Sequence, residues 1–417
     1  MKAEKSRVKV YFYENGVDRM KQRLGIIDGI RGFSLIGILM ANMLIFQYGI
    51  WGMDELEQFR LFAGDEAANI WLKVFVEGSF MPIFMFLFGY SMIKMKAKLN
   101  EKGGKVKRHF TRRFFLLIGL GLLHSTFVWE GDILFSYGCL GLLMMVFLKR
   151  QKKTILIWAV TLLVLTSLIG LGNAIEETPE DIQRMETYVK KASFIYKDGS
   201  YTEIKEFRNS GEDPLGLPIG AYLFIMLLTP FLMCPLFLFG MYAAKVDCFT
   251  VPKMERGLYM RYASILVPSG LLLKSSPYLF PNTPWAGVAE FLGAPLLAIG
   301  YIFAFALLYA NGVNPVFLKL FENVGRLSMS NYLLQSVICT SIFYGYGLGL
   351  FGQIGVINGI LLAIVIYGLQ VIYSHYYLKV WKVGPFEKLM RVGTYLRWSG
   401  SVKKPARVDI IQIEKQA

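Results

Sequence analysis

Long apolar runs recur along almost the whole of this chain, and they limit the fold it can adopt more than any other feature. They lie at about 26–48, 71–93, 114–129, 132–148, 154–173, 218–244, 262–280, 286–309, 327–349 and 356–378. A helix crosses the hydrocarbon core of a bilayer with roughly 20 apolar residues. Because the runs are continuous and far longer than strands, they predict an all-α, polytopic integral membrane helix bundle of about ten transmembrane helices.

The composition agrees with a membrane protein and excludes several other classes. Of the 417 residues, 54% are hydrophobic and only 18% are charged, whereas an average soluble domain is about 25% charged. The four cysteines, Cys139, Cys234, Cys248 and Cys339, have no paired spacing. We therefore expect neither a disulfide framework nor a metal site. The first run follows a basic tail without a small-residue cleavage site, so we expect a retained span rather than a signal peptide.

The net charge of +15 is unevenly distributed, and its distribution predicts the orientation in the membrane. With the N-terminus inside, 35 of the 45 Lys and Arg residues fall in cytoplasmic segments and 7 in outer segments. This bias follows the positive-inside rule, so we expect both termini in the cytoplasm and no nucleic-acid partner. The expected organisation is a basic tail at 1–25, a bundle at 26–378 with an extracytoplasmic loop at 174–217, and a basic tail at 379–417. Within that loop, the stretch from Pro179 to Tyr188 is a candidate for a short surface helix.

A few ionisable residues remain inside the predicted spans: Asp28, Arg31, Lys73, Glu77, Lys274 and Glu290. Each costs about 2.5–3.5 kcal/mol at the bilayer centre, so such residues tend to face the bundle interior. Asp28 and Arg31 are spaced to pair on one helix face, as are Lys73 and Glu77. A structural ion pair near a helix end is the alternative. The residues that we expect to line a substrate cavity are Asp28, Arg31, Asn42, Glu77, Asn331 and Gln335.

One histidine is singled out by its position late in a predicted span, close to the outer face. After His124 comes a short turn with Glu130 and Asp132, and the next span begins at Ile133. Asp132 is placed to cap that next helix, which is its structural role. The hairpin also brings both carboxylates within reach of His124, and a carboxylate that orients an imidazole makes a general base. The alternative for His124 is a hydrogen-bonded packing residue.

Five blocks of sequence, in order, resemble the YeiB-like family of bacterial membrane proteins. They are Arg23-x4-Asp28-x2-Arg31-Gly32-Phe33; Glu77-Gly78-x-Phe80 with Phe84-x2-Leu87-Phe88-Gly89; Gly121-Leu122-Leu123-His124 with Gly131-Asp132-Ile133-Leu134; Gly325-Arg326-x-Ser328-x-Ser330-Asn331-Tyr332-Leu333-x-Gln335-Ser336; and Gly384-Pro385-x-Glu387-x3-Arg391. The blocks extend over nearly the whole chain. The resemblance implies a multi-pass protein of the bacterial plasma membrane.

The first span and the stretch Pro82-x-Phe84-x2-Leu87-x-Gly89-x-Ser91 are also similar to the transmembrane acyltransferases, including heparan-alpha-glucosaminide N-acetyltransferase. That resemblance implies transfer of an acyl group, most simply acetyl, from cytosolic acetyl-CoA or another acyl-CoA to an extracytoplasmic sugar or other hydroxyl or amine acceptor. The chain departs from that enzyme because residues 50–80 contain no histidine. The catalytic role would then rest on His124, with Asp132 or Glu130 holding its tautomer.

A basic inner face fits such a donor, because an acyl-CoA carries several phosphate charges. The residues expected to bind them through charge-assisted hydrogen bonds are Arg23, Arg108, Arg112, Arg113 and Arg326. The alternative function is a transporter for a small anionic or zwitterionic solute, which embedded charges also fit. A membrane scaffold ranks last, because it gives the embedded polar residues no purpose. The sequence leaves the oligomeric state open, a dimer included.

Overall fold

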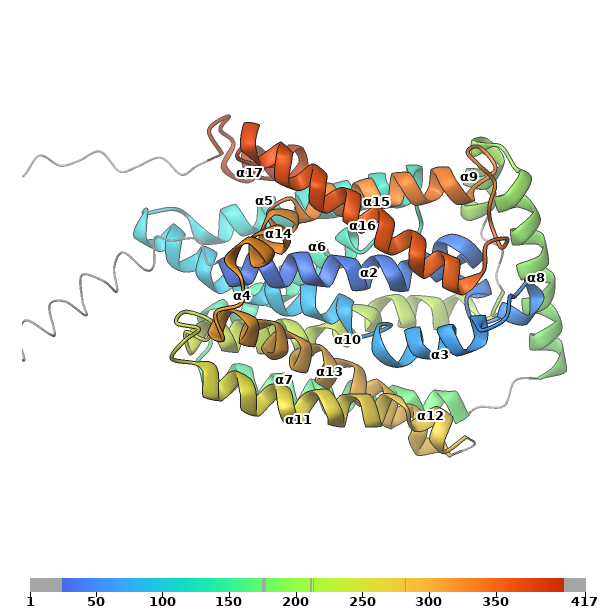
Figure 1. Cartoon of the computed structure of the whole chain (residues 1–417), viewed down its shortest axis with the longest axis horizontal. Coiled ribbons are helices and arrows are strands. Elements are labelled where there is room, and N and C mark those ends of the chain that lie inside the picture. Colours follow the sequence, from blue (N-terminus) through green and yellow to red (C-terminus); the bar gives the residue numbers. More distant parts are fainter. Residues whose placement is uncertain (1–24, 175–177, 211, 213, 282, 401–417) are drawn as a thin grey trace, which may run out of the picture.

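The structure is a computed structural model that describes residues 25–174, 178–210, 212, 214–281 and 283–400, and within these ranges it contains helices and no strands. Most of the long helices run side by side along the longest axis of the molecule (Figure 1). The expected all-α membrane helix bundle is therefore confirmed.

The elements follow one another with short connections. The α-helices are α2 (Gly25–Gly52), α3 (Asp65–Phe75), α4 (Phe80–Glu101), α5 (Val106–Phe127), α6 (Leu134–Met144), α7 (Lys152–Ser167), α8 (Pro179–Asp198), α9 (Tyr201–Asn209), α10 (Ile219–Lys245), α11 (Arg256–Lys274), α12 (Ser276–Leu279), α13 (Pro284–Ala310), α14 (Pro315–Arg326), α15 (Ser328–Phe343), α16 (Gly355–Val380) and α17 (Pro385–Tyr395). Short 3-10 helices are η1 (Leu56–Gln58), η2 (Met145–Lys149) and η3 (Leu168–Ala174).

Each expected apolar run contains at least part of a helix. In the described part of the chain, 5 helical segments are long and apolar enough to cross a membrane: Gly25–Gly52, Asp65–Glu101, Lys152–Gly172, Pro284–Ala310 and Gly355–Val380. Large apolar side chains face outward, such as Ile157 (64% exposed) and Leu369 (61% exposed), as expected where lipid and not water surrounds the protein. The number of crossings, about ten, stays a prediction.

The run at 71–93 is not one helix, contrary to expectation. The helix α3 ends at Phe75 and α4 begins at Phe80, and Gly78 between them has a φ of 64°, which glycine adopts without strain because it has no Cβ. The break takes Glu77 out of the helix. Lys73 and Glu77 therefore do not pair on one helix face as predicted, and Nζ of Lys73 lies 2.7 Å from Oδ1 of Asp54 instead.

The segment 311–326, which lies between two predicted spans, forms the helix α14, and α14 packs along α2. Glycines on both helices allow the close approach. A Cβ on Gly32 would lie 2.0 Å from the carbonyl oxygen of Phe321, and one on Gly325 would lie 1.8 Å from that of Asp28. Small residues let membrane helices pack backbone against backbone, so this contact holds α14 within the bundle.

The helices α4 and α10 cross in the same way. A Cβ on Gly89 would lie 2.0 Å from the carbonyl oxygen of Phe237, and one on Gly240 would lie 1.9 Å from that of Phe86. Each glycine therefore faces the backbone of the other helix. The crossing fixes α4, which supplies one wall of the cavity described below.

The expected outer loop forms α8 and α9, which lie across the end of the bundle opposite the start of α2 (Figure 1). A short surface helix at Pro179 to Tyr188 was predicted, and the observed α8 is longer. Both helices begin with a capping box, Thr178 with Asp181 and Ser200 with Glu203. Hydrogen bonds from Thr178 and Ser200 hold the pKa of Asp181 and that of Glu203 below their usual values.

Candidate functional site

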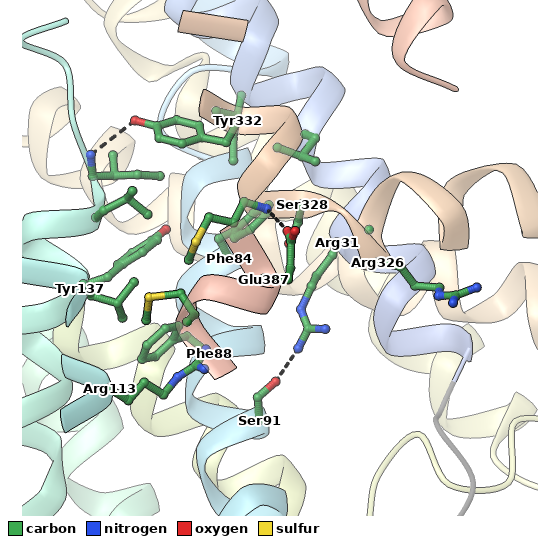
Figure 2. A pocket seen from close by; sticks show the side chains of 18 of the residues that line it. Arg31, Phe84, Phe88, Ser91, Arg113, Tyr137, Arg326, Ser328, Tyr332 and Glu387 are labelled. Atoms are coloured by element: carbon green, nitrogen blue, oxygen red, sulfur yellow. Dashed lines mark hydrogen bonds between the residues drawn. The ribbon is translucent and has the colours of Figure 1, made fainter. Parts of the chain in front are cut away.

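A cavity of about 230 Å³ lies among α2, α4, α5, α6, α14, α15 and α17, and four arginines line it. We call it the arginine cavity, after Arg31, Arg113, Arg326 and Arg391. Its apolar lining includes Phe84, Phe88, Ile133 and Leu134, and its other polar groups include Ser91, Tyr137, Ser328, Tyr332 and Glu387. Figure 2 shows Arg31 and Arg113 near one end, with Phe88 and Ser91, and Tyr332 at the other, while Arg326 points away.

The predicted pair of Asp28 and Arg31 is present, with 2.9 Å between Arg31 Nη1 and Asp28 Oδ1. Asp28 is buried, and the second nitrogen of Arg31 donates a hydrogen bond to Ser91 Oγ in α4. The pair thus matches the structural ion pair offered as the alternative, because the guanidinium of Arg31 compensates the charge of the buried Asp28 carboxylate. It also holds the guanidinium of Arg31 at the wall of the cavity, as drawn in Figure 2.

Arg113 has a different environment. Its guanidinium lies 5.9 Å from the centre of the Phe88 ring, and the positive charges of Arg31 and Arg391 both act on it. Like charges in close proximity repel one another, and an anion placed between them relieves that repulsion. The arginine cavity is therefore suited to a ligand with negative charge.

One carboxylate in this cavity, that of Glu387, was not among the predicted site residues. Glu387 Oε1 accepts hydrogen bonds from the backbone N–H groups of Met329 (2.8 Å) and Ser330 (3.1 Å), and its Oε2 accepts one from Ser330 Oγ (2.6 Å). It thereby caps the start of α15, and its negative charge interacts favourably with the positive end of the helix dipole. Glu387 belongs to the last of the YeiB-like blocks quoted above, but only the fold reveals that this block contacts the Ser328-x-Ser330 block.

Two further hollows extend the basic surface away from the cavity. One is lined by Lys98, Lys102, Arg113 and Arg391, and the next by Lys102, Lys105, Arg108 and Arg112. Each shares a basic residue with its neighbour, so basic side chains continue from the α4–α5 connection to the arginine cavity. Arg108 and Arg112 thus line one hollow and Arg113 lines its neighbour and the arginine cavity, whereas Arg23 lies outside the described residues.

The predicted contact between His124 and Asp132 is present. The His124 Nδ1 atom lies 2.7 Å from Asp132 Oδ2, and both side chains are almost fully buried. Asp132 Oδ1 accepts a hydrogen bond from the Phe135 backbone N–H at 2.9 Å, so the same carboxylate also caps the first turn of α6. The remaining nitrogen of the imidazole, Nε2, is buried and has no hydrogen-bond partner among the described residues. This is the arrangement of an oriented base whose reactive atom is available.

Tyr332 separates His124 from the arginine cavity. Its ring lines the cavity, and its centre lies 5.7 Å from that of the imidazole. Its hydroxyl accepts a hydrogen bond from the Ile133 backbone N–H at 3.3 Å and donates one to the Gly131 carbonyl at 3.3 Å. These bonds tie α15 to the hairpin that carries Asp132. His124 is therefore next to the basic cavity without lining it.

Glu130 does not orient His124, although the sequence offered it as an alternative to Asp132. Its Oε2 accepts a hydrogen bond from the Tyr196 hydroxyl of α8 at 2.8 Å. Burial raises the pKa of the Glu130 carboxyl, while this hydrogen bond and the charge of Arg208 oppose the increase. Glu130 therefore joins the hairpin between α5 and α6 to the helix α8.

The other predicted substrate residues lie apart from the arginine cavity. Asn331 Nδ2 donates to Ser374 Oγ (3.0 Å) and Gln335 Nε2 to Gln370 Oε1 (2.8 Å), so both join α15 to α16. Asn42 is half-buried in α2 and lines neither the arginine cavity nor the basic hollows.

Glu77 lies in the turn between α3 and α4. The Lys274 ammonium group donates hydrogen bonds to its backbone carbonyl and to Ser79 Oγ. One carboxyl oxygen of Glu77 is buried without a partner among the described residues. This group is separate from His124. Among the described residues, no cluster of His, Cys, Asp and Glu has the arrangement of a metal site.

Comparison with known proteins identifies the family of the chain. Residues 243–397 match a family model described as "Protein of unknown function (DUF418)". The chain is 32% identical over 393 residues to the uncharacterized protein YxaH of Bacillus subtilis, a match that covers 92% of this chain and 97% of the relative. The uncharacterized protein YeiB of Escherichia coli is 25% identical over 407 residues, covering 91% and 98%. The chain belongs to this YeiB-like, DUF418 family.

An uncharacterized 39.9 kDa protein of Bacillus acidopullulyticus is 26% identical over 382 residues. No solved structure matches the chain significantly. The YeiB-like blocks at Gly325 to Ser336 and at Gly384 to Arg391 fall inside the matched family region. In the fold they meet through Glu387 and Ser330 and form one wall of the arginine cavity.

Proposed function

We propose that this YeiB-like protein is a membrane acyltransferase that moves an acyl group, most simply acetyl, from a cytosolic acyl-CoA to a hydroxyl or amine acceptor. The observation that carries the proposal is the buried His124–Asp132 pair, whose imidazole keeps Nε2 unpartnered among the described residues. A packing histidine would be expected to use both nitrogens, because an unsatisfied buried polar atom costs about 1–3 kcal/mol.

The donor end of the proposal rests on the basic surface. The phosphates of an acyl-CoA bind the basic residues of the α4–α5 connection, and the pantetheine arm enters the arginine cavity along Phe84 and Phe88. The thioester is then directed towards Tyr332. For the carbonyl carbon to meet His124, the Tyr332 ring has to move aside when the donor binds. Use of a cytosolic donor requires that the protein lies in the bacterial plasma membrane with both termini in the cytoplasm.

The reaction itself needs one base and one leaving group. His124 Nε2 takes the proton of the acceptor hydroxyl or amine, and the oxygen or nitrogen forms a bond to the thioester carbonyl carbon. The carbon–sulfur bond then breaks, and the CoA sulfur takes the proton from His124. Asp132 does not touch the substrate, and it holds the imidazole tautomer that leaves Nε2 able to accept the proton.

The test is release of free thiol from acetyl-CoA by purified protein in lipid vesicles. The wild type is compared with His124→Gln, which keeps a polar side chain but has no base. A matched control is His375→Gln, because His375 contacts Asn323 and lies outside the arginine cavity. We expect thiol release by the wild type and by the control, and a loss of about 10²-fold or more in His124→Gln. Equal rates in all three would refute the proposal.

A transporter is the second candidate, and the turn at Glu77 favours it. A buried carboxyl oxygen without a partner, beside the ammonium group of Lys274, is a feature of substrate or proton paths in membrane proteins. Uptake of a small anionic solute into proteoliposomes without any acyl donor, lost in Glu77→Gln, would support this alternative.

A further inference from the structure

A second hollow, which we call the lateral groove, lies between α5, α15, α16 and the start of α17, and it has a volume of about 410 Å³. Its lining is almost entirely apolar and includes Leu123 of α5 and Leu334 and Val337 of α15. These side chains are 59%, 37% and 48% exposed, respectively. The groove therefore opens on the side of the bundle, within segments expected to be surrounded by lipid.

His124 lines this groove, and it is the buried polar group that could act there. Only 4% of the residue is exposed, and Nε2 has no hydrogen-bond partner among the described residues. Because Nδ1 is held by Asp132, Nε2 is the imidazole atom left for a molecule in the groove. His124 lies one turn before the end of α5 at Phe127.

The outer helices cover this end of α5. Tyr201 of α9 donates a hydrogen bond to the carbonyl of Phe127 (2.7 Å), and Arg208 donates to those of Thr126 and Val128 (3.2 Å each). The Tyr196–Glu130 hydrogen bond joins α8 to the same hairpin. These bonds hold α8 and α9 against the hairpin from the outside, whereas the lateral groove remains open on its lipid-facing side.

We propose that the acceptor is a membrane lipid that enters sideways, with its hydrocarbon chains in the lateral groove and a headgroup hydroxyl or amine at His124 Nε2. This inference rests on the proposed acyltransferase function and narrows its acceptor. A lipid fits because its chains match the apolar lining and it is already concentrated where the groove opens. A sugar in water would have to pass α8 and α9 and then desolvate its hydroxyl groups against leucines.

The transfer to a lipid headgroup uses the same step as the transfer to any other hydroxyl or amine acceptor. The headgroup O–H or N–H loses its proton to His124 Nε2, its oxygen or nitrogen bonds to the acyl carbon, and the carbon–sulfur bond breaks. CoA leaves as a thiol with that proton. The products are an acylated lipid and free CoA.

The test follows the label from acetyl-labelled acetyl-CoA in vesicles of phosphatidylethanolamine and phosphatidylglycerol. These two lipids offer an amine and hydroxyl groups, and extraction with chloroform separates labelled lipid from water-soluble products. Leu334→Trp and Val337→Trp place a larger side chain in the groove at exposed positions. Ile157→Trp is the matched control, because this residue of α7 is 64% exposed and lies away from the groove.

We expect His124-dependent label in the lipid fraction. Each groove variant should reduce it about tenfold or more, the size expected when an apolar pocket loses volume, and the control should keep the wild-type rate. Thiol release with label only in water-soluble products would overturn the lipid acceptor, and full lipid labelling by both groove variants would overturn its entry through the lateral groove. Either result would leave the proposed function standing. Absence of any His124-dependent thiol release would overturn both. The distribution of label in the wild type decides the question even if the groove variants fold poorly.

Discussion

The carboxylate of Asp132 has two tasks, because Oδ2 holds His124 and Oδ1 caps α6. The Asp132→Asn variant separates them. An amide oxygen can still accept from the Phe135 N–H, so α6 keeps its cap, but the charge that stabilises the protonated imidazole is lost. We expect the kcat for thiol release to fall about 10²–10⁴-fold, with little change in the KM for acetyl-CoA.

The pH profile distinguishes this positioning role from a packing role. If Asp132 orients the base, the rate of the variant should show an altered dependence on pH while its thermal midpoint stays near that of the wild type. A variant that unfolds at lower temperature and retains the wild-type kcat in its folded fraction would contradict the prediction.

Arg113 lies among like charges, and this predicts opposite effects on stability and binding. In Arg113→Gln the repulsion with Arg31 and Arg391 is weaker, so we expect a thermal midpoint equal to or above that of the wild type. The same change removes a partner of the donor's anionic groups, and the KM for acetyl-CoA should rise about tenfold. Thermal unfolding and thiol-release kinetics on one preparation check both. A lower midpoint with an unchanged KM would show that Arg113 is structural.

At the scale of helices, two glycine crossings hold the bundle together. Gly89→Ala would place a Cβ 2.0 Å from the Phe237 carbonyl oxygen, so α4 and α10 must separate. Overpacking of this kind costs about 1–3 kcal/mol, and we expect a lower thermal midpoint. Gly119→Ala is the control, because nothing lies within 4 Å of its Cβ and alanine favours the helix. Equal midpoints for the two variants would contradict the close crossing.

The helices also show what the sequence could predict and where it failed. Continuous apolar runs predicted the helices of the bundle, and a spacing of eight residues across a tight turn predicted the contact between His124 and Asp132. The break at Gly78 and the helix at 315–326 were missed. Apolarity reports contact with lipid, whereas these features depend on one glycine conformation and on packing against α2.

Contacts between distant segments could not be predicted from the sequence for the same reason. Glu387 caps α15 from 57 residues further along the chain, and Tyr332 meets the hairpin across about 200 residues. Neither partner can be deduced from local spacing. Asn331 and Gln335 were assigned to a cavity because they are polar residues in a span, but their amide nitrogens donate interhelical hydrogen bonds instead.

At the scale of the whole molecule, the start of α2 and the helix α17 lie at one end, and α8 with α9 at the other (Figure 1). The charge bias predicts that the first of these ends is cytoplasmic. Reporter fusions check this. We expect a fluorescent protein at either terminus to mature, and alkaline phosphatase inserted after Gly199 to be active. An active phosphatase at the C-terminus would contradict the predicted orientation.

The vectorial use of acyl-CoA is tested most directly by thiol release from acetyl-CoA in sealed vesicles of opposite orientation. In the predicted orientation, inverted vesicles expose the end of the bundle with α17 to the medium, and right-side-out vesicles expose α8 and α9. With acetyl-CoA outside, we predict release by inverted vesicles of the wild type, little release by right-side-out vesicles until they are permeabilised, and none above background from His124→Gln in either. Equal release from both orientations, or release that does not depend on His124, would contradict a cytosolic acyl donor used by this histidine.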